Sequence, residues 1–433
     1  MSFNRPVGGR SCGPLLTHAL WSVCLAVLLS SPALAQSSWD DELASALTNG
    51  EFDLKFSYRY EFVDADRPIS DTNPSKVRDA NASTLRTRLV YKSGEFKNVF
   101  LTLNMDDLRP IVANDFDDTR NGKSQYAIVP DPKGTDLNLA SLTWTGLENG
   151  TVVLGRQRIK RANVRFIGNV VWRQNEQTYD SISFGYKPVE KLDLFYAYVD
   201  RVKRVLGPNE NGSGISASLA TWQSNSHLLD GTYTFSPALK LFGYAYLLDF
   251  KNAADFSSST IGLRATGAVE FGNGPTLGYQ AEFARQGDYK DNPNSYDANY
   301  VLLDGALSWQ TFGFRLMYEV LEGNGQPFTS FLTPLATLHK FNGWADRFLV
   351  TPADGLEDFA IEGNVKFLQG NWRLIYHKFT ANKGGADYGD EIDFAASWQI
   401  GKRYTVLVKA AFYSADQFAF DTDKVWFQFT ADF

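Results

Sequence analysis

The sequence predicts an all-β fold, a transmembrane antiparallel β-barrel of about eighteen strands. Two observations support this fold class: apolar and polar side chains alternate along many short segments, and short and long connections alternate between these segments. No segment after residue 35 approaches the roughly 18 consecutive apolar residues that a membrane-spanning helix needs. Strands rather than helices are therefore expected to cross the membrane.

The alternation is clearest at the start of the barrel. Phe52 and Tyr60 fall on one face of an extended chain, and Lys55 and Arg59 fall on the other. A barrel wall needs this period of two, because one face contacts lipid and the other faces the water-filled interior. We find eighteen such segments, including residues 261–270, 359–367, 391–398 and 425–433.

The connections give independent support. Eight are short, near residues 92–97, 146–150, 188–190, 236–238, 272–275, 310–311, 369–371 and 400–402. Nine are longer, at residues 63–80, 107–135, 159–177, 201–225, 250–258, 287–297, 322–356, 381–389 and 415–422. Outer-membrane barrels have short periplasmic turns and long extracellular loops. Both chain ends are therefore expected on the periplasmic side.

The first 35 residues have the features of a cleaved signal peptide. Arg5 and Arg10 precede an apolar run over residues 19–29, and Ala33 and Ala35 are small residues suited to cleavage. The last strand ends on an aromatic residue, as outer-membrane barrels do. We therefore expect a protein of the bacterial outer membrane, with a signal peptide over 1–35, a short periplasmic segment over 36–50 and a barrel over 51–433.

Composition limits the kind of function. Acidic residues outnumber basic ones by 49 to 42, which argues against a nucleic-acid partner, and both cysteines lie in the first 35 residues. His227, His339 and His377 have no spacing that marks a nucleophile with its base or a zinc site, so no enzyme, cofactor or metal is predicted. An outer-membrane lipase or protease remains the alternative, as does a plugged structural or adhesion protein. Asp115, Asp117 and Asp118 form either a solvated acidic loop or a calcium site.

Residues 155–175 form the most unusual segment. The segment carries six basic residues and no acid, and it also contains apolar residues such as Phe166 and Trp172 that favour burial. If it folds into the barrel, its guanidinium groups would narrow the pore and favour anions. The alternative is a solvated basic loop outside the barrel.

Three stretches, residues 155–158, 165–169 and 172–180, resemble the signature region of the alginate export porin family. The resemblance extends over the mature chain through its strand number, loop alternation and signal peptide. It implies a monomeric eighteen-stranded porin with an arginine-lined constriction. By this resemblance, Asp180 holds an arginine in place, and the constriction residues are Arg156, Gln157, Arg158, Arg165, Arg173 and Asp180.

The resulting hypothesis is a passive channel in outer-membrane lipid for anionic small molecules or an acidic polysaccharide such as alginate. A general porin without selectivity is the alternative. The strand pattern also places six arginines on the lumen face, together with a similar number of acids: Arg59, Arg86, Arg88, Arg264, Arg315 and Arg373. They form either a basic path for solute or an ion-pair network that braces the wall.

Overall fold

The computed structural model describes residues 36–70, 72–208 and 219–433. The predicted signal peptide, residues 1–35, lies outside the described residues. No helix in the described part of the chain is long and apolar enough to cross a membrane.

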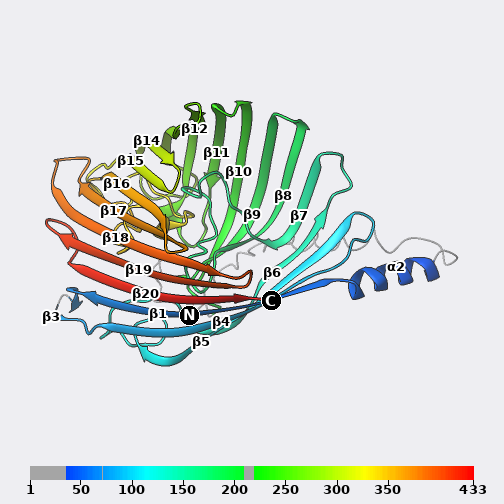
Figure 1. The fold of residues 1–433 in the computed structure, drawn as a ribbon, viewed down its shortest axis with the longest axis horizontal. Coiled ribbons are helices and arrows are strands. Elements are labelled where there is room, and N and C mark those ends of the chain that lie inside the picture. Colours follow the sequence, from blue (N-terminus) through cyan, green and yellow to red (C-terminus); the bar gives the residue numbers. More distant parts are fainter. Residues whose placement is uncertain (1–35, 71, 209–218) are drawn as a thin grey trace, which may run out of the picture.

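Eighteen antiparallel strands form one closed barrel, as predicted (Figure 1). Each strand pairs with its neighbours in the chain, and the first strand pairs with both the next wall strand and the last, which closes the cylinder. The wall strands are β1 (Glu51–Ala65), β4 (Ala80–Lys92), β5 (Val99–Asp115), β6 (Gly134–Trp144), β7 (Gly150–Gln157), β8 (Thr178–Val189), β9 (Leu192–Lys203), β10 (Thr221–Ser236), β11 (Leu239–Leu248), β12 (Ser258–Glu270), β13 (Thr276–Asp288), β14 (Asp297–Trp309), β15 (Phe312–Leu321), β16 (Leu356–Phe367), β17 (Gly370–Thr380), β18 (Asp387–Ile400), β19 (Tyr404–Ala415) and β20 (Thr422–Asp432).

Long and short connections alternate around the whole barrel, which confirms the predicted topology. The longest loops join β5 to β6, β7 to β8, β9 to β10 and β15 to β16, whereas β14 and β15 are joined by a tight turn. Two short strands, β2 (Pro68–Ser70) and β3 (Asn73–Lys76), form a separate two-stranded sheet within the β1–β4 loop.

The outer face of the wall is apolar. Phe52, Ile261, Leu263 and Phe283 expose more than half of their surface, at 66, 66, 55 and 54%. Large apolar side chains exposed around a closed barrel are typical of a wall that contacts lipid. The predicted location in the outer membrane is thus confirmed, because the outward side chains are apolar and suited to contact with lipid chains.

The inner face departs from the expectation that it contacts only water. Tyr244 and Tyr300 point inward from β11 and β14, and both are buried. Phe166, from the β7–β8 loop, packs on these two rings with centroid distances of 5.3 and 5.2 Å. Phe348, from the β15–β16 loop, packs in the same way on Phe379 of β17 at 4.5 Å. Part of the lumen is therefore a core in which long loops cover inward aromatic residues.

A helix, α2 (Gln36–Thr48), precedes β1 in the segment predicted to be periplasmic. It lies outside the cylinder, at the end where the chain terminates (Figure 1). Trp39 of this helix packs on Phe96 with ring centroids 5.3 Å apart, and the amide of Gly94 donates to the carbonyl of Ala46 at 2.8 Å. The helix is thereby attached to the β4–β5 turn.

Candidate functional site: a constriction formed by two loops

Two long loops enter the barrel and bond to each other. The β7–β8 loop covers residues 158–177, and the β15–β16 loop covers residues 322–355. The amide of Gly168 donates to the carbonyl of Leu335 at 2.8 Å, and the amide of Thr337 donates to the carbonyl of Val164 at 3.0 Å. The basic segment therefore folds inward, and with its partner loop it forms a constriction.

Arginines of the β7–β8 loop anchor it to several parts of the wall. Arg158 contacts Glu176 within its own loop at 2.5 Å and also donates to Asn104 of β5. The other anchors reach distant strands: Arg161 pairs with Asp230 of β10, Arg165 with Glu319 of β15, and Arg173 with Glu61 of β1. The loop is thus held across the lumen by ion pairs.

Burial separates these arginines into two groups. Arg165 and Arg173 are only 1 and 5% exposed, so their guanidinium groups hold the loop in place and cannot meet a solute. The side chain of Arg158 is 29% exposed and that of Arg161 is 22% exposed, so the guanidinium groups of these two residues remain accessible from the lumen. Arg165 and Arg173 therefore brace the loop, since a charge buried at this depth needs a paired opposite charge.

The structure corrects the placement of Arg156 and Asp180. These residues face each other across β7 and β8 and form a two-point ion pair at 2.7 and 3.0 Å. They share their face of the wall with Ile182, which is 44% exposed on the outside of the barrel. Asp180 does hold an arginine, but the pair lies outside the pore. Gln157 points inward and is bonded to the backbone of β8.

All six arginines expected on the lumen face point inward. Arg59, Arg86 and Arg88 are covered by the β7–β8 loop: they donate to the carbonyls of Trp172 and Gln174 and to the carboxylate of Glu176, respectively. The remaining three are Arg264 of β12, Arg315 of β15 and Arg373 of β17. Each of these has a carboxylate partner: Arg264 has Glu282 at 3.9 Å, Arg315 has Asp304 at 2.7 Å, and Arg373 has Glu362 at 2.6 Å.

Lys340, from the β15–β16 loop, lies within reach of the charges of Arg264, Arg315 and Arg373. Its ammonium donates to the carbonyl of Asn163 at 3.0 Å, and the residue is exposed. Loss of hydration among the loops, followed by the positive charges of Arg315, Arg264 and Arg373, lowers the pKa of the Lys340 ammonium. Within the described residues it has no carboxylate partner. We call Arg264, Arg315, Lys340 and Arg373 the lower basic cluster.

Sequence reasoning found the three arginines of this cluster through the strand alternation, but it did not find Lys340. A lysine in a loop of more than thirty residues carries no periodic signal that would place it. Likewise, the acids that hold Arg161, Arg165 and Arg173 come from strands far away in the chain, and no local pattern connects them.

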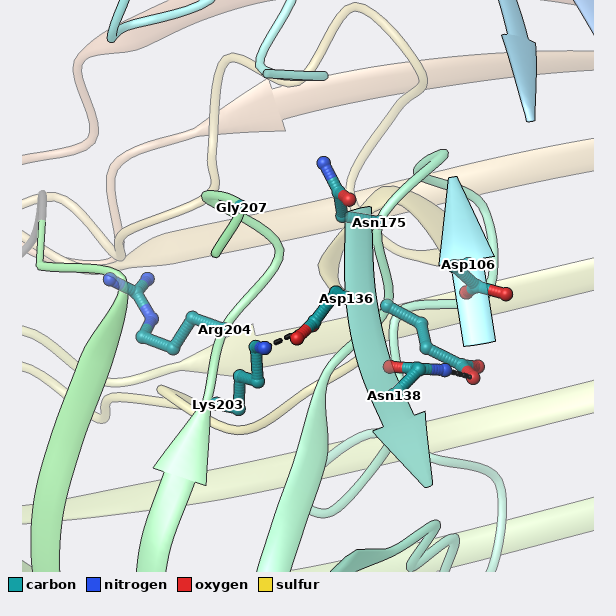
Figure 2. A pocket seen from close by; sticks show the side chains of 8 residues that line it. Asp106, Asp136, Asn138, Asn175, Lys203, Arg204 and Gly207 are labelled. Atoms are coloured by element: carbon teal, nitrogen blue, oxygen red, sulfur yellow. Dashed lines mark hydrogen bonds and ion pairs between the residues drawn. The ribbon is translucent and has the colours of Figure 1, made fainter. Parts of the chain in front are cut away.

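A small polar pocket lies beside the constriction, between β5, β6 and the end of β9 (Figure 2). Lys203 pairs with Asp136 on one side, and Asp106 lies on the other, where it pairs with Arg88. The pocket measures about 10 Å³, which is room for about one water molecule. Since its charged groups are paired and the space is small, it is not a site for solute.

The histidines and the aspartates of the acidic loop bond to other groups of the protein. His227 lies on the outer face of β10, as its neighbour Leu229 does, and bonds to the hydroxyl of Tyr196. His339 and His377 lie inside the barrel, where each bonds to an aspartate. The aspartates at 117 and 118 accept hydrogen bonds from the backbone of their own loop. Among the described residues, no group of three or more potential ligands could hold a metal ion.

A closed eighteen-stranded barrel with an apolar outer face and loops folded into its lumen defines an outer-membrane barrel of the channel type. A scan against models of known protein families finds no match, and a search of curated proteins finds none either.

Solved structures nevertheless share the fold. OccAB2 of Acinetobacter baumannii matches with a TM-score of 0.68 and 17% identity over 90% of this chain and 99% of that chain. OccK3 (OpdO) of Pseudomonas aeruginosa matches with a TM-score of 0.66 and 13% identity over 92 and 99%. OpdK of the same organism, solved with vanillate, matches with a TM-score of 0.65 and 12% identity over 89% of this chain and 99% of that chain.

At these identities the likeness shows the fold alone, the eighteen-stranded barrel of the Occ and OprD channels, which are not enzymes. The resemblance to the alginate export family is not confirmed by any of the comparisons.

Proposed function

We propose that the protein is an outer-membrane channel for small solutes that carry a carboxylate, and that the lower basic cluster is where the carboxylate binds. The supporting observation is the charge balance of this cluster. Its three arginines have carboxylate partners at 2.6 to 3.9 Å, whereas the described residues offer Lys340 none. One positive charge is therefore left for a solute.

The surrounding geometry supports weak, reversible binding. The side chains of Arg315 and Arg373 are 29 and 40% exposed, so a carboxylate at Lys340 can also approach these guanidinium groups without displacing their partners. Guanidinium groups bind carboxylates through two parallel hydrogen bonds. Conduction requires sites that attract the ion and still release it, and partly neutralised cations satisfy both needs.

The size of the solute follows from the two loops. Because they are bonded to each other and to several strands, the constriction is fixed and favours short solutes over a polymer. Vanillate, the molecule bound in the OpdK structure, is a small carboxylate. An alginate-like polysaccharide is the second candidate, favoured by the signature-like motif at residues 155–180.

Swelling of liposomes that contain the purified protein tests the proposal. We expect small monocarboxylates to enter faster than neutral sugars of similar size, and oligouronates to enter slowly. Lys340→Gln should remove most of this preference. Lys187→Gln, at an exposed lysine paired with Asp193 near a short turn, is the matched control and should keep it.

Equal rates for carboxylates and neutral sugars would indicate a general porin and contradict the proposal. Faster entry of oligouronates than of small carboxylates would support the polysaccharide candidate instead.

A further inference from the structure

Lys409 of β19 lies in an aromatic cage inside the barrel. Its ammonium is 3.6 Å from the ring centre of Trp344, 4.2 Å from that of Trp172 and 5.3 Å from that of Trp426. It also contacts Nε2 of His339 at 2.6 Å. The residue is only 5% exposed, and no carboxylate of the described chain is within ion-pair distance of it. A buried lysine with this environment is unusual, because buried charges are normally paired with opposite charges.

The bond to Lys409 fixes the state of His339. An ammonium can only donate, so Nε2 of His339 must be the acceptor and must be unprotonated. The proton of the neutral ring is then on Nδ1, which donates to Asp346 at 2.7 Å. Trp172 stacks on the same imidazole, with centroids 4.4 Å apart and an angle of 6° between the planes. The histidine is thereby fixed in position and orientation.

The cage collects residues from both loops and from the wall. Trp172 belongs to the β7–β8 loop, His339 and Trp344 belong to the β15–β16 loop, and Trp426 belongs to β20. The contact is supported next to the cage by Asp346, which pairs with Lys424 of β20 at 2.8 Å. One wall side chain therefore touches both loops that form the constriction.

Lys340 follows His339 directly in the chain, and both lie in one turn of 3-10 helix, η3 (Leu338–Lys340). A residue that holds His339 in place therefore also holds the backbone of Lys340 in place. The cage is thus connected to the lower basic cluster by a single peptide unit.

We infer that Lys409 is the positioning residue of the constriction: its caged ammonium holds both loops against β19 and β20 and sets the place of Lys340. A cation is suited to this role because it attracts the faces of several indoles at once and also donates a hydrogen bond to imidazole. An apolar residue could fill the space, but it would not orient the rings or the histidine. The effect on solute rests on the proposed function, whereas the effect on the loops does not.

Hydrogen exchange, followed by mass spectrometry on the full-length mature barrel in detergent, tests the inference without reference to transport. Lys409→Met keeps much of the volume and removes the charge. We expect amides in residues 158–177 and 322–355 to exchange at least tenfold faster, while wall strands stay protected. Lys409→Arg should retain slow exchange, because guanidinium also binds indole faces. Lys55→Met, at a half-exposed lysine of β1 paired with Asp432, is the control and should leave the loops unchanged.

Single-channel recording adds the functional readout. We expect Lys409→Met to give frequent partial closures and a weaker anion preference. If the variant folds and its loops exchange as slowly as in the unchanged protein, the inference is wrong even if the channel is anion-selective. If the unchanged protein does not conduct while the exchange result holds, the proposed function is wrong and the positioning role stands. Should Lys409→Met fail to fold, slow loop exchange in His339→Leu, which removes the acceptor, would overturn the inference.

Discussion

Buried ion pairs do most of the positioning at the scale of single residues. Arg165 and Glu319 are both 1% exposed and meet at 2.8 and 3.1 Å in a two-point contact. Such a pair costs much of its attraction in lost hydration, so its net contribution to stability is small. Removing one partner is different, because the remaining charge is buried without compensation.

Glu319→Gln should therefore lower the free energy of unfolding by about 3 kcal/mol or more. Urea titration in lipid vesicles would measure the change. Asp297→Asn, at a pair with Arg285 whose side chains are 61 and 69% exposed, should change it far less, because solvent screens exposed ion pairs. Equal effects of the two substitutions would show that the Arg165 pair is solvated.

His339 gives the loops a pH dependence. Burial is the main cause that lowers its pKa well below 6.5, and the charges of Lys409 and Arg173 act in the same direction, against Asp346. The folded protein thus keeps the ring neutral, while the unfolded chain takes up a proton as the pH falls below about 6.5. This contribution favours folding less at acid pH.

We expect the urea concentration at the unfolding midpoint to decrease when the pH is lowered from 7.5 to 5. The decrease should be smaller in His339→Gln, which has no such proton to take up. The difference between the two pH profiles measures the contribution of His339. Parallel profiles would mean that the imidazole is protonated in the folded state.

The strands illustrate, at the scale of elements, which parts of the fold a sequence can predict. A period of two and the spacing of turn residues are local signals, and they placed the wall strands and their lumen arginines. Arg156 is different: its expected place in the constriction, beside Arg158, rested on the resemblance to the alginate export family and not on strand alternation. In the structure β7 ends at Gln157, so Arg158 turns into the lumen while Arg156 stays on the outer face.

The inward course of the loops could be predicted only in part. Arg158, Arg165 and Arg173 lie inside the barrel, which is one of the two arrangements that the mixture of basic and apolar residues left open. The carboxylates that hold Arg165 and Arg173, and the position of the whole β15–β16 loop with Lys340, depend on contacts between residues far apart in the chain. No pattern within either loop encodes such contacts.

Gly155 allows the end of β7 to adopt its shape. Its φ is +112°, and a Cβ there would lie 2.3 Å from the carbonyl oxygen of Ala140. Gly155→Ala should therefore weaken the β6–β7 pairing and lower the free energy of unfolding by about 1 to 3 kcal/mol.

Gly305→Ala is the matched control, since a Cβ at that strand position meets no atom within 4 Å. Thermal unfolding of both variants in detergent would measure the two effects. A Gly155→Ala variant as stable as the control would show that the backbone relaxes at this position.

At the scale of the whole molecule, the outer and inner faces of the barrel wall differ in composition. The outer face exposes many large apolar side chains, whereas the inner face is partly a packed core and partly a charged path. Loops that complete the core also carry the cations of the constriction, so the fold and the proposed selectivity depend on the same segments. The closed sheet supplies the rigid frame, because every wall strand is bonded on both sides.

The reversal potential of the unchanged protein in a planar bilayer, under a gradient of potassium chloride, tests the central claim most directly. The surplus positive charge at Lys340 predicts a potential shifted toward the equilibrium potential of chloride. A potential shifted toward that of potassium would contradict an anion-selecting constriction, and a membrane that stays closed would contradict the channel itself.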